Sequence, residues 1–133
     1  MSYPYVLETA GATVHCYEEF GAYQGDWLAK VTYKNQTGWI HSYFGSCTGC
    51  DAFLNEFGYE DHVCGDNKYY DPIENSFIED CPKCQEIKAR LIRFGQDYLE
   101  TVQSYEDVLE EISENIEWDY DVKEMVQFLK DNK

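Results

Sequence analysis

The sequence predicts a single α+β domain, 1–133, in which a small N-terminal antiparallel β-sheet packs with C-terminal α-helices. Aromatic and β-branched residues alternate with polar ones before residue 46, and apolar residues recur at helical spacing after residue 82. With 133 residues, of which 44% are hydrophobic and 17% aromatic, the chain can bury one core. We expect a β-rich half at 1–46, a cysteine and loop region at 47–84 and a helical half at 85–133.

The clearest strands form a predicted hairpin. In the segment 27–33, large apolar residues alternate with polar ones, which is the period of a half-buried strand. A second aromatic run at 39–44 follows the stretch 35–38, whose length and final glycine are typical of a hairpin turn. Another strand is expected at 13–17. The expected inward face of the first strand is Trp27, Ala29, Val31 and Tyr33, and its polar face is Lys30, Thr32 and Lys34.

Apolar stripes predict three helices in the last third of the chain. The first lies at 82–100, and the second begins at Ser104, with Asp107 three residues on as a capping-box-like pair. The third covers 122–129 with Asp119 or Asp121 as its cap, and a shorter helical segment is expected at 51–57. The stripes are Ile87, Leu91, Phe94 and Tyr98, then Tyr105, Val108, Leu109, Ile112 and Ile116, then Val122, Met125, Val126 and Leu129.

Two Cys-x-x-Cys pairs, Cys47/Cys50 and Cys81/Cys84, flank an acidic, tyrosine-rich loop at 58–80. Each pair can offer two thiolates from one tight turn, and each directly precedes a predicted helix, whose N-terminus favours thiolate charge. A loop this long inside a compact domain needs something to fasten it. We therefore predict a structural four-cysteine zinc site that clamps the loop, although its spacer is longer than usual.

Other residues compete with this assignment. His62 and Cys64 lie in the spacer, and either could replace one zinc ligand. Cys16 is expected to be a small buried side chain, and His15 and His41 to be hydrogen-bonded strand residues. Four thiolates would close the zinc shell, so a catalytic metal is not expected, and no catalytic sequence motif is present. We expect a protein without enzymatic activity.

The charge of the chain restricts its partners. It has 26 acidic and 10 basic residues, a formal net charge of −16 and an isoelectric point near 4.3. This charge repels nucleic acid and anionic membranes and favours a basic partner. Neither a secretory signal nor an apolar run long enough for a membrane span is found, so we expect an intracellular protein. The surface charge resists self-association, so we expect a monomer.

Most of the negative charge lies in two regions. Nine acids and one base occupy 47–80, and ten acids and three bases occupy 101–133. The second predicted C-terminal helix has no basic residue between Tyr105 and Trp118, so its like-charge pairs cost on the order of 1–3 kcal/mol. Such a carboxylate row can imitate part of a DNA backbone. The predicted contact rows are Glu110, Glu111, Glu114 and Glu117 in the helix, and Asp61, Asp66 and Asp71 in the loop.

A family resemblance accompanies these features. The motif Gly45-Ser46-Cys47-Thr48-Gly49-Cys50-Asp51-Ala52-Phe53, the later Cys-x-x-Cys and the acidic helical tail resemble small phage or prophage proteins. In character the chain is most similar to phage anti-CRISPR proteins that inhibit type II-A Cas9, including zinc-holding members. The resemblance implies inhibition by direct protein binding in the cytoplasm of the bacterial host, on a basic, nucleic-acid-binding lobe. It transfers no particular contact residues.

Three alternatives stay open. The predicted hairpin also resembles the middle of bacterial SH3-like modules, which implies a small β-barrel or sheet and a wall-binding role. A zinc-stabilised interaction module for another host factor fits the same residues. A thiol oxidoreductase that uses one Cys-x-x-Cys is the enzymatic alternative, although no strand–helix–strand pattern surrounds either pair.

Overall fold

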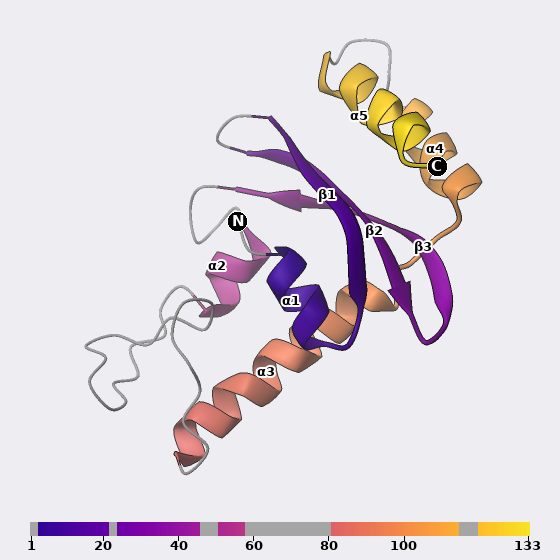
Figure 1. Cartoon of the computed structure of the whole chain (residues 1–133). Coiled ribbons are helices and arrows are strands. Elements are labelled where there is room, and N and C mark those ends of the chain that lie inside the picture. The colour runs from indigo at the N-terminus through magenta and orange to yellow at the C-terminus, as the bar shows by residue number, and fades with distance from the viewer. Residues whose placement is uncertain (1–2, 22–23, 46–50, 58–80, 115–119) are drawn as a thin grey trace.

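A computed structural model describes residues 3–21, 24–45, 51–57, 81–114 and 120–133, apart from the side chains of Leu54 and Tyr120. In these segments one three-stranded antiparallel sheet has the order β1-β2-β3 and is accompanied by helices (Figure 1). The predicted α+β class is confirmed. The strands are β1 (Thr13–Gly21), β2 (Gly25–Tyr33) and β3 (Gln36–Phe44), and the helices are α1 (Tyr3–Thr9), α2 (Ala52–Phe57), α3 (Pro82–Leu99), α4 (Tyr105–Ser113) and α5 (Tyr120–Asp131).

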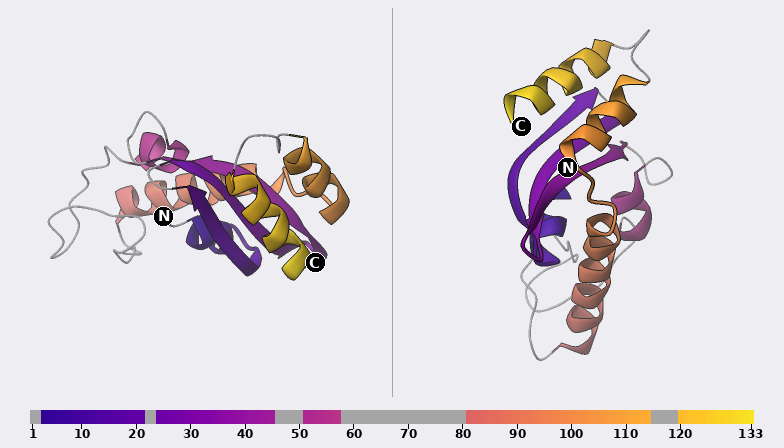
Figure 2. Two further views of the ribbon diagram at one scale, coloured as in Figure 1. Left: turned by 90° about the horizontal axis from the view of Figure 1, so that it is seen from above. Right: turned by 90° about the vertical axis from the view of Figure 1, so that its right-hand side faces the viewer.

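Helices cover both faces of the sheet. The helices α1, α2 and α3 lie on one side, and the pair α4 and α5 lies on the other (Figure 2). The sheet is open, with β1 and β3 at its two edges. None of the described helices is both long enough and apolar enough to cross a lipid bilayer.

The hairpin turn lies earlier than the sequence predicts. Tyr33 pairs with Gln36, so Lys34 and Asn35 form a two-residue turn, with φ values of 52° and 64°. Positive φ at both central positions is the mark of a type I′ turn, which suits the twist of the flanking strands. The predicted turn at 35–38 was wrong because Gly38 belongs to β3.

Gly38 is required by a close approach. A Cβ atom there would lie 2.5 Å from Cγ1 of Val102 and 2.8 Å from the carbonyl oxygen of Gln103. The segment after α3 crosses β3 at this point, and Trp39 and Gln103 exchange two backbone hydrogen bonds of 2.8 and 2.9 Å. Glycine therefore lets the chain pass directly over the strand.

The first core lies between the sheet and the helices α1 to α3. Trp27, Ala29 and Val31 are buried there, which confirms the predicted inward face of β2. The sequence did not predict α1, whose Tyr3 stacks on Trp27 with 4.8 Å between ring centroids. Helix α1 also crosses α3 closely, because a Cβ on Gly95 would lie 2.6 Å from the carbonyl oxygen of Val6.

The second core lies on the opposite face, which the sequence assigned to polar residues. Leu28 and Trp39 are buried there under α4 and α5. Lys30 is partly covered, and its Nζ donates a 2.9 Å hydrogen bond to the carbonyl oxygen of Asn132 after α5. The two predicted helices thus close a second core. Its other buried members are Phe20, Val108, Ile112, Val122, Met125 and Leu129.

Candidate functional site

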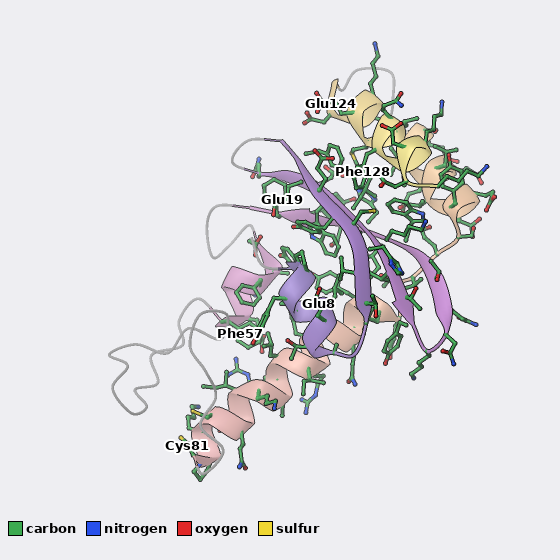
Figure 3. The ribbon with its side chains drawn as sticks, viewed as in Figure 1. Glu8, Glu19, Phe57, Cys81, Glu124 and Phe128 are labelled. Atoms are coloured by element: carbon green, nitrogen blue, oxygen red, sulfur yellow. The ribbon has the colours of Figure 1, made fainter. Side chains whose placement is uncertain are left out.

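The second cysteine pair forms the N-terminus of α3. Cys81 is the N-cap, Pro82 is the first helical residue, and the backbone N–H of Cys84 donates to Sγ of Cys81 at 3.5 Å. Cys84 is fully buried and Cys81 is half-buried. Figure 3 shows Cys81 at the end of α3 that lies away from the sheet. Both cysteines therefore lie at one helix N-terminus.

The residues that flank the first cysteine pair meet at Asp51. This carboxylate is 2% exposed, and it accepts 2.9 Å hydrogen bonds from the backbone N–H of Gly45 and from the hydroxyl of Tyr3. Burial raises the pKa of Tyr3 well above its usual range, and the charges of Tyr98 and Asp51 add to this effect. Tyr3 therefore stays protonated and keeps donating its hydrogen bond to Asp51.

Helix α3 separates Cys84 from the contacts of Tyr3 and Asp51. The ring of Tyr3 lies 5.7 Å from that of Tyr98, near the C-terminus of α3, whereas Cys84 lies in its first turn. At 1.5 Å per residue, fourteen residues of helix span about 21 Å. Cys47 and Cys50 lie outside the described residues, so the four-cysteine ligand set stays a prediction.

Many predicted site residues cannot be placed. Among the residues that the structure describes, no group of three or more candidate ligands could hold a metal ion. Cys16 is half-buried against the second core, and burial raises the pKa of its thiol, as expected for a small buried side chain. The predicted residues outside the described segments are Cys47, Cys50, Asp61, His62, Cys64, Asp66, Asp71 and Glu117.

Helix α4 presents acidic side chains to solvent. Val108 and Ile112 are buried against the sheet, and Ser104 caps the helix by accepting a 3.1 Å hydrogen bond from the N–H of Asp107, as predicted. The helix contains no basic residue. Its exposed acidic residues and its acidic C-cap are Glu106, Asp107, Glu110, Glu111 and Glu114.

One member of the predicted row has a structural role. Oε2 of Glu111 accepts a 3.1 Å hydrogen bond from the side chain of Gln103 and lies 3.0 Å from Nδ1 of His41. His41 Nε2 lies 2.6 Å from Oδ2 of Asp26. The His41 side chain is only 7% exposed, and its contacts with the two carboxylates tie β2, β3 and α4 together.

Sequence reasoning placed His41 correctly as a hydrogen-bonded strand residue, but it missed the partners. Asp26 and His41 lie on the same face of adjacent strands, a relation that a correct hairpin register would have revealed. His15 also behaves as expected, because its Nε2 lies 2.6 Å from Oγ1 of Thr32. Asp51 and Gln103 carry no local sequence signal, since their roles depend on contacts between distant segments.

A cavity of about 280 Å³ opens at the end of the β2–β3 pair that lies away from the hairpin turn. The ring of Tyr43, which is 64% exposed, lies 5.3 Å from the His41 ring and forms one wall. The cavity combines an aromatic wall with a carboxylate. Its lining residues are Gln24, Gly25, Asp26, Tyr43 and Phe44.

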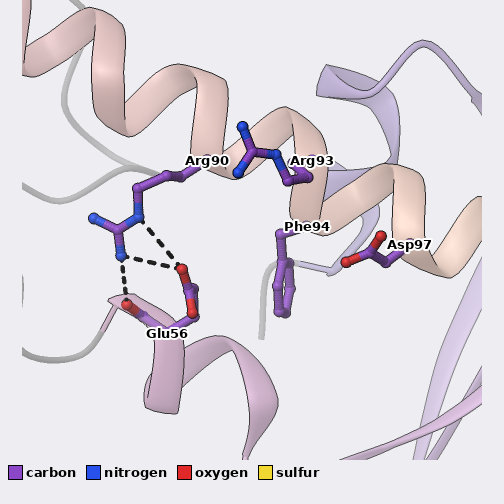
Figure 4. A pocket seen from close by; sticks show the side chains of 5 residues that line it. All are labelled: Glu56, Arg90, Arg93, Phe94 and Asp97. Carbon is purple, nitrogen blue, oxygen red and sulfur yellow. Dashed lines mark hydrogen bonds and ion pairs between the residues drawn. The ribbon is translucent and has the colours of Figure 1, made fainter.

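A second cavity, of about 120 Å³, lies between α2 and α3 (Figure 4). Arg90 donates hydrogen bonds to Oε1 of Glu56 at 3.2 and 3.3 Å and to its backbone carbonyl at 3.0 Å. Arg93, Phe94 and Asp97 complete the lining, so two guanidinium groups balance two carboxylates. The arrangement clamps α2 to α3 and offers no net charge to an ionic ligand.

No protein-family model, curated protein or solved structure matches the chain.

Proposed function

We propose that this chain is a non-catalytic protein that binds a basic surface of a nucleic-acid-handling partner through α4 and thereby inhibits it. The observation that supports the proposal is the outward face of α4. Four exposed acidic residues are carried on a helix whose apolar side is fixed in the second core. They are Glu106, Asp107, Glu110 and Glu114.

The binding energy would come from relief of electrostatic repulsion. Acidic residues three or four apart on a helix repel each other by about 0.2–0.5 kcal/mol per pair. Lysine and arginine side chains of a partner remove that repulsion, and a helix already held on the sheet loses little entropy on binding. Carboxylates spaced about 6 Å apart along a helix face can occupy positions that phosphates hold in a nucleic-acid groove.

Cas9 is the first partner to test, because the resemblance to anti-CRISPR proteins implies it. In this proposal the protein works in the cytoplasm of the bacterial host, competes with nucleic acid for a basic lobe and performs no covalent chemistry. Its affinity should fall as salt rises, since exposed charges are screened within about 10 Å at 0.1 M salt.

The experiment is a titration of Cas9, free and guide-loaded, at low and moderate salt. The variant Glu106→Gln/Asp107→Asn/Glu110→Gln/Glu114→Gln removes the exposed face but keeps Glu111. Four charge contacts at about 0.5 kcal/mol each predict roughly 30-fold weaker binding. A matched control changes four exposed acids outside α4, Glu8, Glu18, Glu86 and Glu100, to glutamine.

The outcomes separate site binding from bulk charge. Near-wild-type affinity in the control, together with weak binding in the α4 variant, supports the proposed surface. Equal losses in both variants would mean that only net charge matters. If the wild-type protein binds neither form of Cas9 at either salt, Cas9 is not the partner.

We further propose that a structural zinc ion fastens the chain, with Cys81 and Cys84 supplying two ligands and Cys47 and Cys50 the other two. The N-cap geometry of α3 supports the first two ligands, because it presents both sulfurs at one helix N-terminus. Zinc binding of this kind contributes on the order of 10 kcal/mol to folding. Elemental analysis should find one zinc per chain.

Single substitutions identify the ligands. Cys81→Ser and Cys50→Ser should lower the zinc content, whereas Cys16→Ser is the matched control and should retain it. Zinc loss in Cys64→Ser or His62→Asn, with retention in Cys50→Ser, would replace the first pair as ligands. Absence of zinc combined with fast thiol titration would favour the thiol oxidoreductase alternative.

A further inference from the structure

Half of the outer edge of β3 has no strand beside it among the described residues. Trp39 turns its N–H and C=O outward, where both pair with Gln103. Outward and inward groups alternate along an antiparallel strand, so His41 and Tyr43 turn theirs to the same edge. In the part of the chain that the structure describes, neither residue has a backbone hydrogen bond beyond the sheet ladder.

Within the described segments, this part of the edge lacks the usual protection against pairing. Natural edge strands are blunted by lysine, proline, a bulge or a covering segment. The stretch 40–44 contains no lysine or proline, the irregular register lies on β1 between Val14 and Cys16, and Gln103 covers only Trp39. Tyr43 is 64% exposed.

Side-chain chemistry next to this edge selects an occupant. The cavity of about 280 Å³ lies directly beside Tyr43 and contains Asp26. Glu111 lies on the same face, where it bonds His41, and the exposed acids of α4 follow. A strand added here would place alternate side chains on this acidic side. Lysine or arginine at those positions would be complementary, whereas a second copy of the chain would oppose −16 with −16.

We propose that the free half of the β3 edge binds an extended, lysine- or arginine-bearing segment of the partner protein as a fourth strand. The inference rests on the proposed function and specifies how the basic partner is held. Main-chain hydrogen bonds to His41 and Tyr43 supply register, the cavity receives one side chain, and Asp26 with the α4 acids supplies charge. Edge pairing gives affinity, and the alternate side chains give specificity.

The test compares Tyr43→Pro with Tyr43→Ala in the same Cas9 titration. Both variants remove the tyrosine ring, but only proline removes the outward N–H, and that N–H is not used by the β2–β3 ladder. We expect proline to weaken binding at least about tenfold more than alanine, because it removes a hydrogen bond and blocks the edge. Thermal unfolding of both variants checks that the fold is kept.

A second measurement needs no substitution. A ten-residue peptide of alternating lysine and valine is added to the wild-type protein, and amide hydrogen exchange is followed by NMR. Exchange at His41 and Tyr43 should slow about tenfold, while other exposed amides keep their rates. A peptide of the same length and charge, with proline in place of each valine, is the control, because proline disfavours a paired strand.

The outcomes distinguish this inference from the proposed function. If the α4 variant weakens Cas9 binding but proline and alanine at Tyr43 behave alike, the acidic surface stands and the edge inference fails. If Cas9 does not bind at all, unchanged exchange at His41 and Tyr43 with the peptide overturns the edge inference separately. Protection that rises with protein concentration alone, with a dimer in sedimentation, would assign the edge to a second copy and overturn it too.

Discussion

The two faces of the sheet carry cores of different construction. On one face, aromatic rings from three helices interlock around Trp27, and Tyr3 and Tyr98 both pack on its ring. On the other face, mainly aliphatic residues of two consecutive helices cover Leu28 and Trp39. The first core is closed by α1, α2 and α3, whereas the second is closed by the two consecutive helices α4 and α5, which form a cover over the sheet. We therefore expect the proposed binding surface to lie on the part that opens at lower cost.

Buried phenols strengthen this contrast. Burial is the main cause that raises the pKa of Tyr3, Tyr17 and Tyr98 above the usual range of tyrosine. Their hydroxyls stay protonated at ordinary pH, and those of Tyr3 and Tyr17 donate to Asp51 and Glu19. Hydrogen bonds of these hydroxyls thus stabilise the aromatic face of the sheet. On the opposite face, the contact between His41 and Glu111 holds α4 to the sheet.

The largest expected effect is on the aromatic face. Trp27→Ala removes a fully buried ring that contacts Tyr3, Tyr17 and Tyr98, so the free energy of unfolding should fall by about 3–5 kcal/mol. Urea denaturation measures the loss. Tyr43→Ala on the neighbouring strand is the exposed aromatic control, and it should change stability little. Comparable losses in both would contradict the assignment of the core.

The second effect tests whether the cover opens by itself. Leu129→Ala removes a fully buried side chain of α5, so the free energy of unfolding should fall by about 2–4 kcal/mol. Amide exchange should accelerate mainly in α4 and α5, while α1 and α3 keep their protection. Uniform acceleration throughout the described elements would show that the two cores unfold as one unit, and the contrast between the faces would then lose its energetic basis.

The third effect concerns the contacts of His41 with Asp26 on β2 and with Glu111 on α4. His41→Ala leaves Asp26 and Glu111 facing each other without the ring between them, so stability should fall by about 1–3 kcal/mol. Adding Asp26→Asn and Glu111→Gln to this variant should restore part of the loss, because the repulsion disappears. Thermal and urea unfolding give both numbers. If the triple variant is no more stable than His41→Ala, charge balance is not what His41 provides.

The strands could be predicted from alternation, but the second core could not be read from the same rule. Alternation correctly put Trp27, Ala29 and Val31 on one face. It treated the opposite face as solvated because Lys30 and Thr32 lie there, although Leu28 and Trp39 are buried. Coverage of that face depends on α4 and α5 folding back from the far end of the chain, and local periodicity does not encode this.

Short elements and turns also depend on tertiary contacts. Helix α1 has seven residues, too few to show a repeating stripe, and it is held by packing on Trp27 and α3. Gly38 looked like a turn residue, but its missing side chain serves the crossing of Val102 and Gln103. For the candidate site, the acidic row on α4 followed from the sequence. The contact between Glu111 and His41 could not be predicted from the sequence, since it depends on the position of His41 in the sheet.

The smallest expected effect on stability is that of Glu114→Lys, which tests whether Glu114 of α4 belongs to the proposed contact surface. Glu114 is exposed at the C-terminal end of α4, next in the acidic row after Glu110. Glu114→Lys replaces repulsion with attraction and places a positive charge at a helix C-terminus, so stability should rise by a few tenths of a kcal/mol. Binding to a basic partner should weaken nevertheless, because the substitution reverses a contact charge.

Urea denaturation and the Cas9 titration of the Glu114→Lys variant are run on the same preparation. Lys123→Glu, at an exposed position on α5, changes the net charge by the same amount in the opposite direction and serves as the control for bulk charge. A protein that is both slightly more stable and a weaker binder identifies Glu114 as a residue kept for the partner at the expense of the fold. A more stable protein with unchanged binding would place Glu114 outside the contact and limit the proposed surface to the first two turns of α4.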